Sequence, residues 1–136
     1  MGVGLGFAIA AAAVHPGRRI VAVEGDSAFG FSGMEVEVAC RYQLPITFII
    51  INNNGIGGGV DEIDPARGIP PSVYTPRARY ERIIEAFGGR GFFVEKPAEL
   101  ETALKEALAD PRPTIVNVMI GTKADRKPQK YGWLTR

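Results

Sequence analysis

Residues 20–56 read IVAVEGDSAFGFSGMEVEVACRYQLPITFIIINNNGI, and two apolar runs in this stretch decide the fold. The first run, at 20–24, is rich in β-branched residues and predicts a strand that is buried on both faces. The second run, at 46–51, is the strongest strand signal in the chain. Between them, residues 33–42 predict a helix that the Leu-Pro pair at 44–45 ends. A strand, a helix and a second strand in this order predict two parallel strands of one sheet.

The alternation of helix and strand continues on both sides of that stretch. Further strands are predicted at 91–95 and 114–120, and further helices at 6–14, 78–87 and 97–109. The first of these helices is rich in alanine and is expected to be buried. The residues expected to face the core from the other helices are Met34, Val38 and Tyr42; Tyr80, Ile83, Ile84 and Phe87; and Leu100, Leu104 and Leu108.

Four apolar strands separated by helices predict an α/β fold, in which helices cover both faces of a parallel sheet. Residues 60–77 carry four prolines and no periodicity, so we expect a long loop there. Loops of this length are usually functional or mobile. We assign residues 1–120 to one domain and residues 121–136 to a polar C-terminal tail.

Composition narrows the class of protein. A chain of 136 residues is long enough for one domain, and its net charge of +1 argues against a general binder of nucleic acid or membrane surfaces. The single cysteine, Cys40, excludes an internal disulfide framework and a cysteine zinc site, and it favours a reducing, cytoplasmic setting. The apolar run at 1–14 lacks a basic flank and is too short to span a bilayer, so we expect no targeting signal and no membrane partner.

Polar residues follow both strands of the deciding stretch at the point where each strand ends. Residues 25–27 predict a turn, and residues 52–59 predict a loop rich in asparagine and glycine. Ligands of open α/β sheets bind beyond the carboxyl ends of the strands. Asp26 can supply a carboxylate oxygen and Asn53 an amide oxygen, while the turn near Gly55 can supply a backbone carbonyl. These are the hard oxygen ligands that Mg²⁺ prefers.

A second set of groups in the same place suits phosphate. Ser27 and Ala28 can present a hydroxyl and backbone N–H groups to phosphate oxygens. Either polar stretch taken alone is more typical of an ordinary turn than of a binding site. Two such stretches, each directly after a buried strand, favour one shared site if the strands are neighbours.

The spacing of these residues resembles a known cofactor motif. Gly25-Asp26-Ser27, then 24 residues, then Asn52-Asn53 resembles the motif of thiamine-diphosphate enzymes. Residues 24–56 are similar more specifically to the family of oxalyl-CoA decarboxylases and 2-hydroxyacyl-CoA lyases, in which serine stands third in the motif. The ending RKPQKYGWLTR, at 126–136, looks more like the lyases. The resemblance covers nearly the whole chain and implies the thiamine-diphosphate-binding fold.

By position, the resemblance implies a role for each matching residue. Asp26, Asn53 and the carbonyl of Gly55 match the family's Mg²⁺ ligands. Ser27 and Ala28 match its contacts to the diphosphate of thiamine diphosphate.

Two more positions correspond to cofactor contacts of the family, one with a matching residue and one without. Met1 matches the bulky apolar residue that wedges the cofactor into a V shape, and a Gly-x-Gly-x-Gly run follows it at 2–6. Gly57 departs from the family pattern, which has tyrosine there. We therefore expect a contact to the diphosphate to be missing and the loop at 57–59 to be looser.

The resemblance also implies segments that this sequence does not contain. In the family, the catalytic glutamate belongs to a separate N-terminal domain that binds the pyrimidine ring, and a middle domain binds CoA. Glu24, Glu35 and Glu37 do not match that glutamate, so we expect no catalytic residue in this chain. We expect another segment or chain to supply the missing domain, and a homo-oligomer, because the family's cofactor lies between two subunits.

These points predict the C-terminal, cofactor-binding domain of a 2-hydroxyacyl-CoA lyase-like enzyme that acts on acyl-CoA and is inactive as this chain alone. Two alternatives stay open: a fragment of an oxalyl-CoA decarboxylase, and a stand-alone or split small subunit of another thiamine-diphosphate enzyme. A Rossmann dinucleotide site has little support, because no G-x-G-x-x-G follows a strand.

Several conspicuous residues are expected to carry no chemistry here. His15 is expected in a solvated turn, and Cys40 is expected to pack within a helix. The basic residues near the end are typical of a solvated tail, although the family's C-terminal segment closes over the active site, where Trp133 and these charges would act. They are Lys123, Arg126, Lys127, Lys130 and Arg136.

Overall fold

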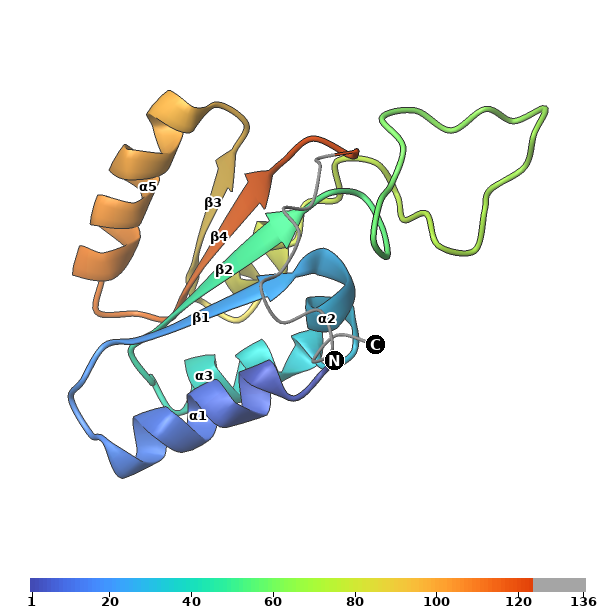
Figure 1. The fold of residues 1–136 in the computed structure, drawn as a ribbon. Helices are drawn as coiled ribbons and strands as arrows, with labels where there is room; N and C mark the ends of the chain where they lie inside the picture. Colours follow the sequence, from blue (N-terminus) through green and yellow to red (C-terminus); the bar gives the residue numbers. More distant parts are fainter. Residues whose placement is uncertain (124–136) are drawn as a thin grey trace, which may run out of the picture.

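A parallel sheet forms the centre of the molecule, as the sequence predicts (Figure 1). The computed structural model describes residues 1–123, and within them the sheet has four strands in the order β1-β2-β4-β3. The strands are β1 (Ile20–Gly25), β2 (Ile46–Asn52), β3 (Arg90–Val94) and β4 (Thr114–Met119). Because β1 and β2 are parallel neighbours, with Gly25 beside Ile51, their carboxyl ends meet at one edge of the sheet.

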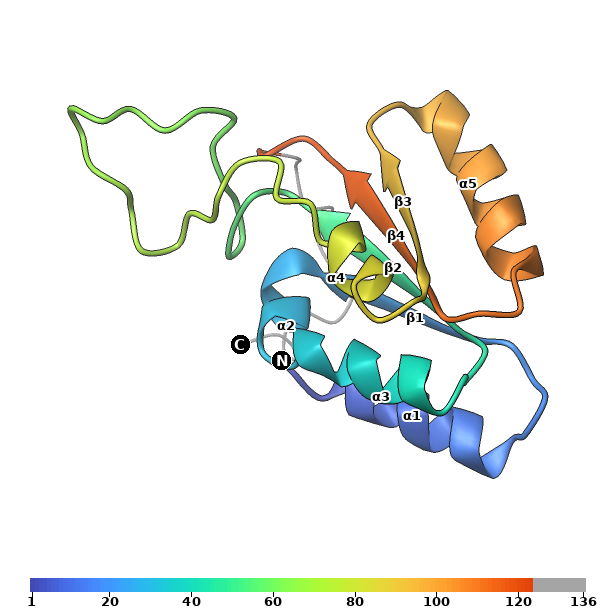
Figure 2. The same ribbon diagram turned by 180° about the vertical axis from the view of Figure 1, so that it is seen from behind.

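Helices lie on both faces of this sheet (Figures 1 and 2). The helices are α1 (Gly4–Val14), α2 (Asp26–Gly30), α3 (Val36–Arg41), α4 (Glu81–Glu85) and α5 (Pro97–Ala109), with a 3-10 turn, η1, at Gly33–Glu35. On one face, α1, α3 and α4 bury a core that includes Leu5, Val36, Phe48 and Ile84. On the other face, α5 buries a smaller core around Ala107.

The first strand is not buried on both faces, and that expectation was wrong. Val21 is 48% exposed and Val23 is 62% exposed, whereas Ile20 and Ala22 pack against the larger core. The reason is the position of α5, which packs on β3 and β4 and leaves the same face of β1 without a helix among residues 1–123. The apolar residues predicted the strand correctly, but they did not predict that one of its faces is exposed to solvent.

The helix predicted at 33–42 exists, but it turns a different side inward. Met34 and Tyr42 are exposed, whereas Val36 and Ala39 are buried. The i, i+4 spacing assumed one continuous α-helix from residue 33, but the first turn is the 3-10 turn η1. Met34 therefore lies outside α3, and the helix packs Val36 and Ala39, which are three residues apart on one face, against the larger core.

The other helices follow the predictions in part. The four residues expected to face inward near α4 do pack in the larger core: Tyr80, Ile83, Ile84 and Phe87. In α5, Leu100 and Leu104 pack against the smaller core, but Leu108 is exposed. Helix α1 begins two residues earlier than predicted, and it is not fully buried, because Phe7 and Val14 lie on an exposed side.

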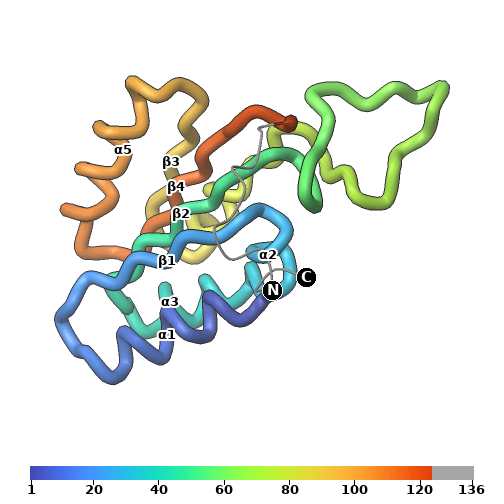
Figure 3. The backbone as a smooth tube through the Cα atoms, in the orientation of Figure 1, coloured from blue at the N-terminus to red at the C-terminus, as the bar shows by residue number. Residues whose placement is uncertain are grey.

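The long loop is confirmed. The segment between β2 and α4 contains no helix or strand and extends beyond the carboxyl edge of the sheet (Figure 3). An isolated antiparallel bridge pairs Gly55 with Val73 and holds the two ends of this segment together. Within the described part of the chain, no helix is long and apolar enough to cross a membrane.

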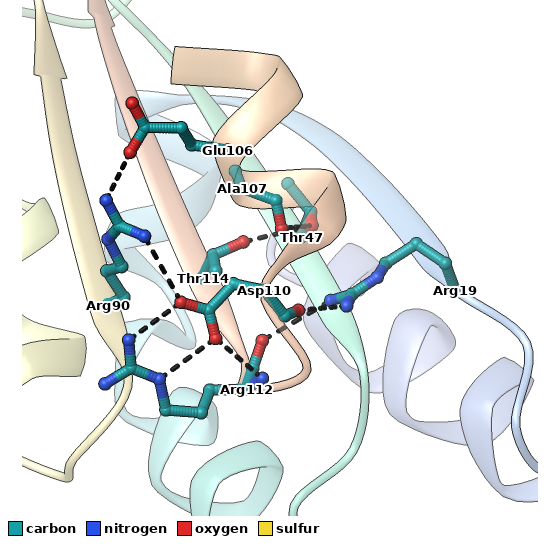
Figure 4. A network of polar contacts seen from close by, with 8 residues as sticks. All are labelled: Arg19, Thr47, Arg90, Glu106, Ala107, Asp110, Arg112 and Thr114. Carbon is teal, nitrogen blue, oxygen red and sulfur yellow. Dashed lines mark hydrogen bonds and ion pairs between the residues drawn. The ribbon is translucent and has the colours of Figure 1, made fainter. Parts of the chain in front are cut away.

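An ion network ties the opposite, amino edge of the sheet together (Figure 4). Asp110 follows α5, and its largely buried carboxylate accepts hydrogen bonds from Arg112 Nη2 at 2.7 Å and Nε at 2.9 Å. Arg90 Nη1 lies 3.5 Å from the same carboxylate. The hydrogen bonds from the Arg112 side chain hold the pKa of Asp110 well below its ordinary value of 3.8. Arg19 donates to the carbonyls of Asp110 and Arg112 and so connects the start of β1 to this corner.

We expect Asp110→Asn to lower the free energy of unfolding by about 1–2 kcal/mol at neutral pH, because both arginines are partly exposed to solvent and screening limits the loss. The wild-type stabilisation is complete above pH 3.8 and is lost as the pH falls through the lowered pKa of the folded state, because the unfolded state then binds the additional proton. Urea unfolding at pH 7 and pH 3 measures both effects. Lys105→Ala is the control, because within residues 1–123 Lys105 pairs only with the exposed Glu101, at 2.6 Å. An equal loss of stability in both variants would contradict the prediction.

Candidate functional site

Asp26 lies at the point where β1 ends and α2 begins. The predicted turn at 25–27 was wrong, because Gly25 remains extended and the helix begins directly at Asp26. The Asp26 side chain is only 1% exposed, and its burial raises the pKa. Its Oδ1 accepts a hydrogen bond from the Ser27 N–H at 2.8 Å, and its Oδ2 accepts one from the Gly55 N–H at 3.0 Å. A buried carboxylate held only by backbone donors keeps lone pairs for a further positive partner.

The three consecutive asparagines after β2 have three different environments. Asn52 and Asn54 are buried, whereas Asn53 is half-buried. The Asn53 amide oxygen accepts a hydrogen bond from the Gly55 N–H at 3.3 Å, and the same N–H donates to Asp26. One backbone N–H therefore draws together oxygens of Asp26 and Asn53, which are two of the three predicted metal ligands. The third, the carbonyl of Gly55, belongs to the same residue.

Gly55 lies in a tight backbone crossing that explains why the residue is glycine. A Cβ atom at this position would lie 2.5 Å from the Ser72 carbonyl oxygen and 2.9 Å from the Gly58 carbonyl oxygen. The crossing is held by the Ile56 N–H, which donates to Ser72 at 2.8 Å, and by the Tyr74 N–H, which donates to Asn54 at 2.9 Å. The long loop therefore returns to the site and packs against the asparagine run.

Gly57 has a backbone conformation that fits its departure from the family pattern. Its φ angle is +76°, in the left-handed region that bulky residues rarely adopt. A tyrosine in this conformation would be strained. The backbone conformation at residue 57 is therefore one that glycine adopts without strain. The looser loop expected at 57–59 stays a prediction.

A cavity of about 670 Å³ opens beside Ser27. Its lining residues come from α2 and from the returning end of the long loop: Ser27, Gly30, Phe31, Val73, Tyr74, Thr75, Ala78 and Tyr80. Burial and the negative charge of Asp26 raise the pKa of Tyr80 to about 12, so its phenol keeps its proton at neutral pH. Residues 73–80 were not predicted to belong to the site; their position near the end of the long loop after the asparagine run is the one sequence signal that points to them.

Two other predicted cofactor contacts, Ala28 and Met1, are not among the residues that line this cavity, but both lie near residues that do. Ala28 is in the first turn of α2, one residue after Ser27. The chain starts beside α2 (Figure 1), and Gly2 packs so closely on Phe31 that a Cβ on Gly2 would lie 2.6 Å from the Phe31 Cβ. Met1, which precedes it, is exposed. Trp133 and the basic residues at 126–136 lie outside the described residues, as does most of the predicted tail.

Glu24 and Glu37 do not line the cavity beside Ser27. Glu37 forms an ion pair with Arg41 at 3.1 Å on α3. Glu24 points both carboxylate oxygens into the protein, where they have no hydrogen-bond partner among the described residues. Burial raises the pKa of Glu24. His15 lies in an exposed turn after α1, and Cys40 packs against the larger core, both as predicted.

The oxygen atoms available at this edge of the sheet determine which metal cation it could bind. No group of three or more His, Cys, Asp or Glu residues that could hold a metal exists within residues 1–123. One carboxylate, one amide oxygen and one carbonyl leave half of an octahedron to waters or phosphate oxygens. Mg²⁺ is usually bound in this way, through one or two carboxylates and the phosphates of a ligand. The residues present fit Mg²⁺ with a diphosphate.

Gly55→Ala tests the crossing directly. We expect it to lower the free energy of unfolding by about 1–3 kcal/mol, because the added Cβ meets backbone oxygens that cannot move independently. Urea unfolding measures the change, and amide hydrogen exchange should show faster exchange at 53–59. Gly6→Ala is the control, because a Cβ at Gly6 meets nothing within 4 Å. If Gly55→Ala proves as stable as Gly6→Ala, the crossing is not tight.

Comparison with known proteins places this geometry in a family. Residues 1–118 match the family model described as "Thiamine pyrophosphate enzyme, C-terminal TPP binding domain". Human 2-hydroxyacyl-CoA lyase 1 is 51% identical, over 100% of this chain and 26% of its own length. Oxalyl-CoA decarboxylase of Escherichia coli K12 is 48% identical, over 91% of this chain and 22% of its own length. The chain thus spans about a quarter of the length of these curated relatives.

A solved structure of a thiamine diphosphate-dependent enzyme has the same fold as this chain. The thiamine diphosphate-dependent 4-hydroxybenzoylformate decarboxylase of Rhodococcus jostii RHA1 superposes with a TM-score of 0.74 and 26% identity. The match covers 92% of this chain and 24% of the decarboxylase chain. The resemblance stated from the motif is therefore confirmed, and the chain belongs to the family of C-terminal thiamine-pyrophosphate-binding domains of thiamine pyrophosphate enzymes.

Proposed function

We propose that this chain binds Mg²⁺ and thiamine diphosphate as the C-terminal domain of a larger 2-hydroxyacyl-CoA lyase-like enzyme. The reaction would cleave or form a carbon–carbon bond in an acyl-CoA. The observation that carries the proposal is the Gly55 N–H, which draws the oxygens of Asp26 and Asn53 together at the ends of β1 and β2. The relatives that are 51% and 48% identical, a lyase and a decarboxylase that both act on CoA thioesters by name, support the substrate class.

Each residue has a part in this proposal. Asp26, Asn53 and the Gly55 carbonyl hold Mg²⁺, and Ser27 and Ala28 contact the diphosphate. When bound, thiamine diphosphate supplies the electron sink for carbon–carbon cleavage, while the protein binds and orients the cofactor.

The cavity and the chain ends complete the proposal. The cavity beside Ser27 receives the cofactor, with the neutral phenol of Tyr80 as a donor in its wall. Met1 and Gly57 flank the cofactor. The proton transfers are made by a domain that precedes this one in the polypeptide or belongs to a second chain, and the complete enzyme is an oligomer.

Asp26→Ala tests the metal assignment. We expect it to abolish Mg²⁺-dependent binding of thiamine diphosphate, because the site then has no anionic ligand to offset the dehydration of the cation. Isothermal titration calorimetry, on this chain and on the longest natural polypeptide that contains it, measures the affinity. Asp64→Ala, in the exposed part of the long loop, removes the same charge and should leave the affinity unchanged. Unchanged affinity in Asp26→Ala would remove the assignment.

The alternatives are separated by two further observations. If the chain is part of a longer polypeptide, the DNA upstream of Met1 stays open in frame and encodes the preceding segment. A start codon at Met1 with an adjacent gene for a pyrimidine-binding domain would instead indicate a split enzyme. Assays with oxalyl-CoA and with a 2-hydroxyacyl-CoA distinguish decarboxylase from lyase. Robust turnover by this chain alone would contradict the need for a second domain.

A further inference from the structure

Three buried polar side chains meet between the sheet and α4, and they are not among the proposed ligands. Asn117 is in the middle of β4, between Ile50 of β2 and Phe93 of β3, and it is 0% exposed. Asn52 ends β2, and Glu81 begins α4; both are also fully buried. An amide or a carboxylate at such a position is costly unless its polar atoms find partners.

These side chains bond to one another in sequence. Asn117 Nδ2 donates to Glu81 Oε2 at 2.9 Å and to the Ala78 carbonyl at 2.9 Å. Asn52 Nδ2 donates to Asn117 Oδ1 at 3.2 Å and also reaches the Ala78 carbonyl at 3.3 Å. The second oxygen of Glu81 accepts a hydrogen bond from Arg79. The start of α4 is thereby tied to the middle of β4 and to the carboxyl end of β2.

The chain of bonds continues into the metal loop. Asn52 Oδ1 accepts a hydrogen bond from the Asn54 N–H at 3.1 Å. Asn54 has a left-handed backbone, with φ of 65°, and its side chain is held by the Arg77 N–H at 2.9 Å and by the Val60 carbonyl at 3.0 Å. The next N–H is that of Gly55, which donates to Asp26. An unbroken path of contacts therefore runs from Glu81 to the proposed metal ligand.

We propose that Glu81, Asn117 and Asn52 are positioning residues for the metal loop. They do not touch the cation; they set the left-handed turn at Asn54, which aims the Gly55 N–H at Asp26 and places the Gly55 carbonyl and the Asn53 amide beside it. The inference about the cation rests on the proposed function. The inference about the loop geometry does not, because it concerns contacts within the chain.

The structure offers a matched control on the same two strands. Thr114 Oγ1 donates to Thr47 Oγ1 at 3.0 Å, and both side chains are 0% exposed. This pair joins β4 to β2 at their amino ends, and Thr47 reaches the Ala107 carbonyl of α5 at 3.5 Å (Figure 4). Asp26 follows the opposite, carboxyl end of β1. Loss of a hydrogen bond here weakens the sheet without altering the asparagine path.

The experiment compares Asn117→Leu with Thr114→Val in this chain and in the longest natural polypeptide that contains it. Both variants should unfold at lower temperature. Only Asn117→Leu should weaken Mg²⁺-dependent binding of thiamine diphosphate, by about 10–100-fold in calorimetry, the usual cost of losing a partner behind a metal ligand. Only Asn117→Leu should speed amide hydrogen exchange at 53–60 beyond the change in Thr114→Val.

A second pair of variants guards against misfolding of Asn117→Leu. Glu81→Gln keeps an acceptor for Asn117 Nδ2, so it should retain the wild-type affinity for Mg²⁺-thiamine diphosphate and the wild-type rate of amide exchange at 53–60. Glu81→Leu has no acceptor, so it should bind the cofactor more weakly and exchange faster at 53–60. Equal effects of Asn117→Leu and Thr114→Val, or of the two Glu81 variants, would overturn the proposal. If the wild-type protein binds no Mg²⁺-thiamine diphosphate, the proposed function fails. The amide exchange rates at 53–60 then still test whether these residues set the geometry of the loop.

Discussion

The hydrogen bond from the Gly55 N–H to Asp26 Oδ2, 3.0 Å long, joins the two halves of the site. Asp26 comes from the first strand and its helix, and Gly55 comes from the loop after the second strand, 29 residues later. The parallel pairing of β1 and β2 brings these two chain segments to the same edge, and this contact joins the Asp26 side chain directly to the loop after β2. Burial raises the pKa of Asp26, whereas this hydrogen bond from Gly55 lowers it and so offsets part of the effect of burial. The tight backbone crossing at Gly55 keeps the donor in place.

Much of this arrangement is predictable from residue types. Apolar runs identified all four strands of the described sheet, and polar residues at their ends identified the edge where a ligand would lie. Parallel pairing is a general property of such sheets, so the meeting of Asp26 and Asn53 required only that the two strands be neighbours, which the strand order confirms. The thiamine-diphosphate motif then supplied the chemistry.

The rest depended on geometry that residue type does not encode. The inward faces of α3 and α5 depend on packing against the sheet, which buries Val36 and Ala39 on one helix and Ala103 and Ala107 on the other. The three consecutive asparagines are the same residue type but have different roles. Asn53 shares the Gly55 N–H with Asp26, Asn52 donates to Asn117, and Asn54 adopts a left-handed backbone conformation. Partners from α4 and β4, distant in sequence, assign these roles.

The uncovered face of β1 has a consequence for handling the protein. Val21 and Val23 are exposed, and β1 pairs with a strand on one side only among residues 1–123. Unpaired backbone donors and acceptors beside exposed β-branched side chains form a template for strand addition, the usual starting point of edge-to-edge aggregation. Solubility of this chain at high concentration therefore depends on whatever covers that edge, independently of how well the cofactor edge is formed.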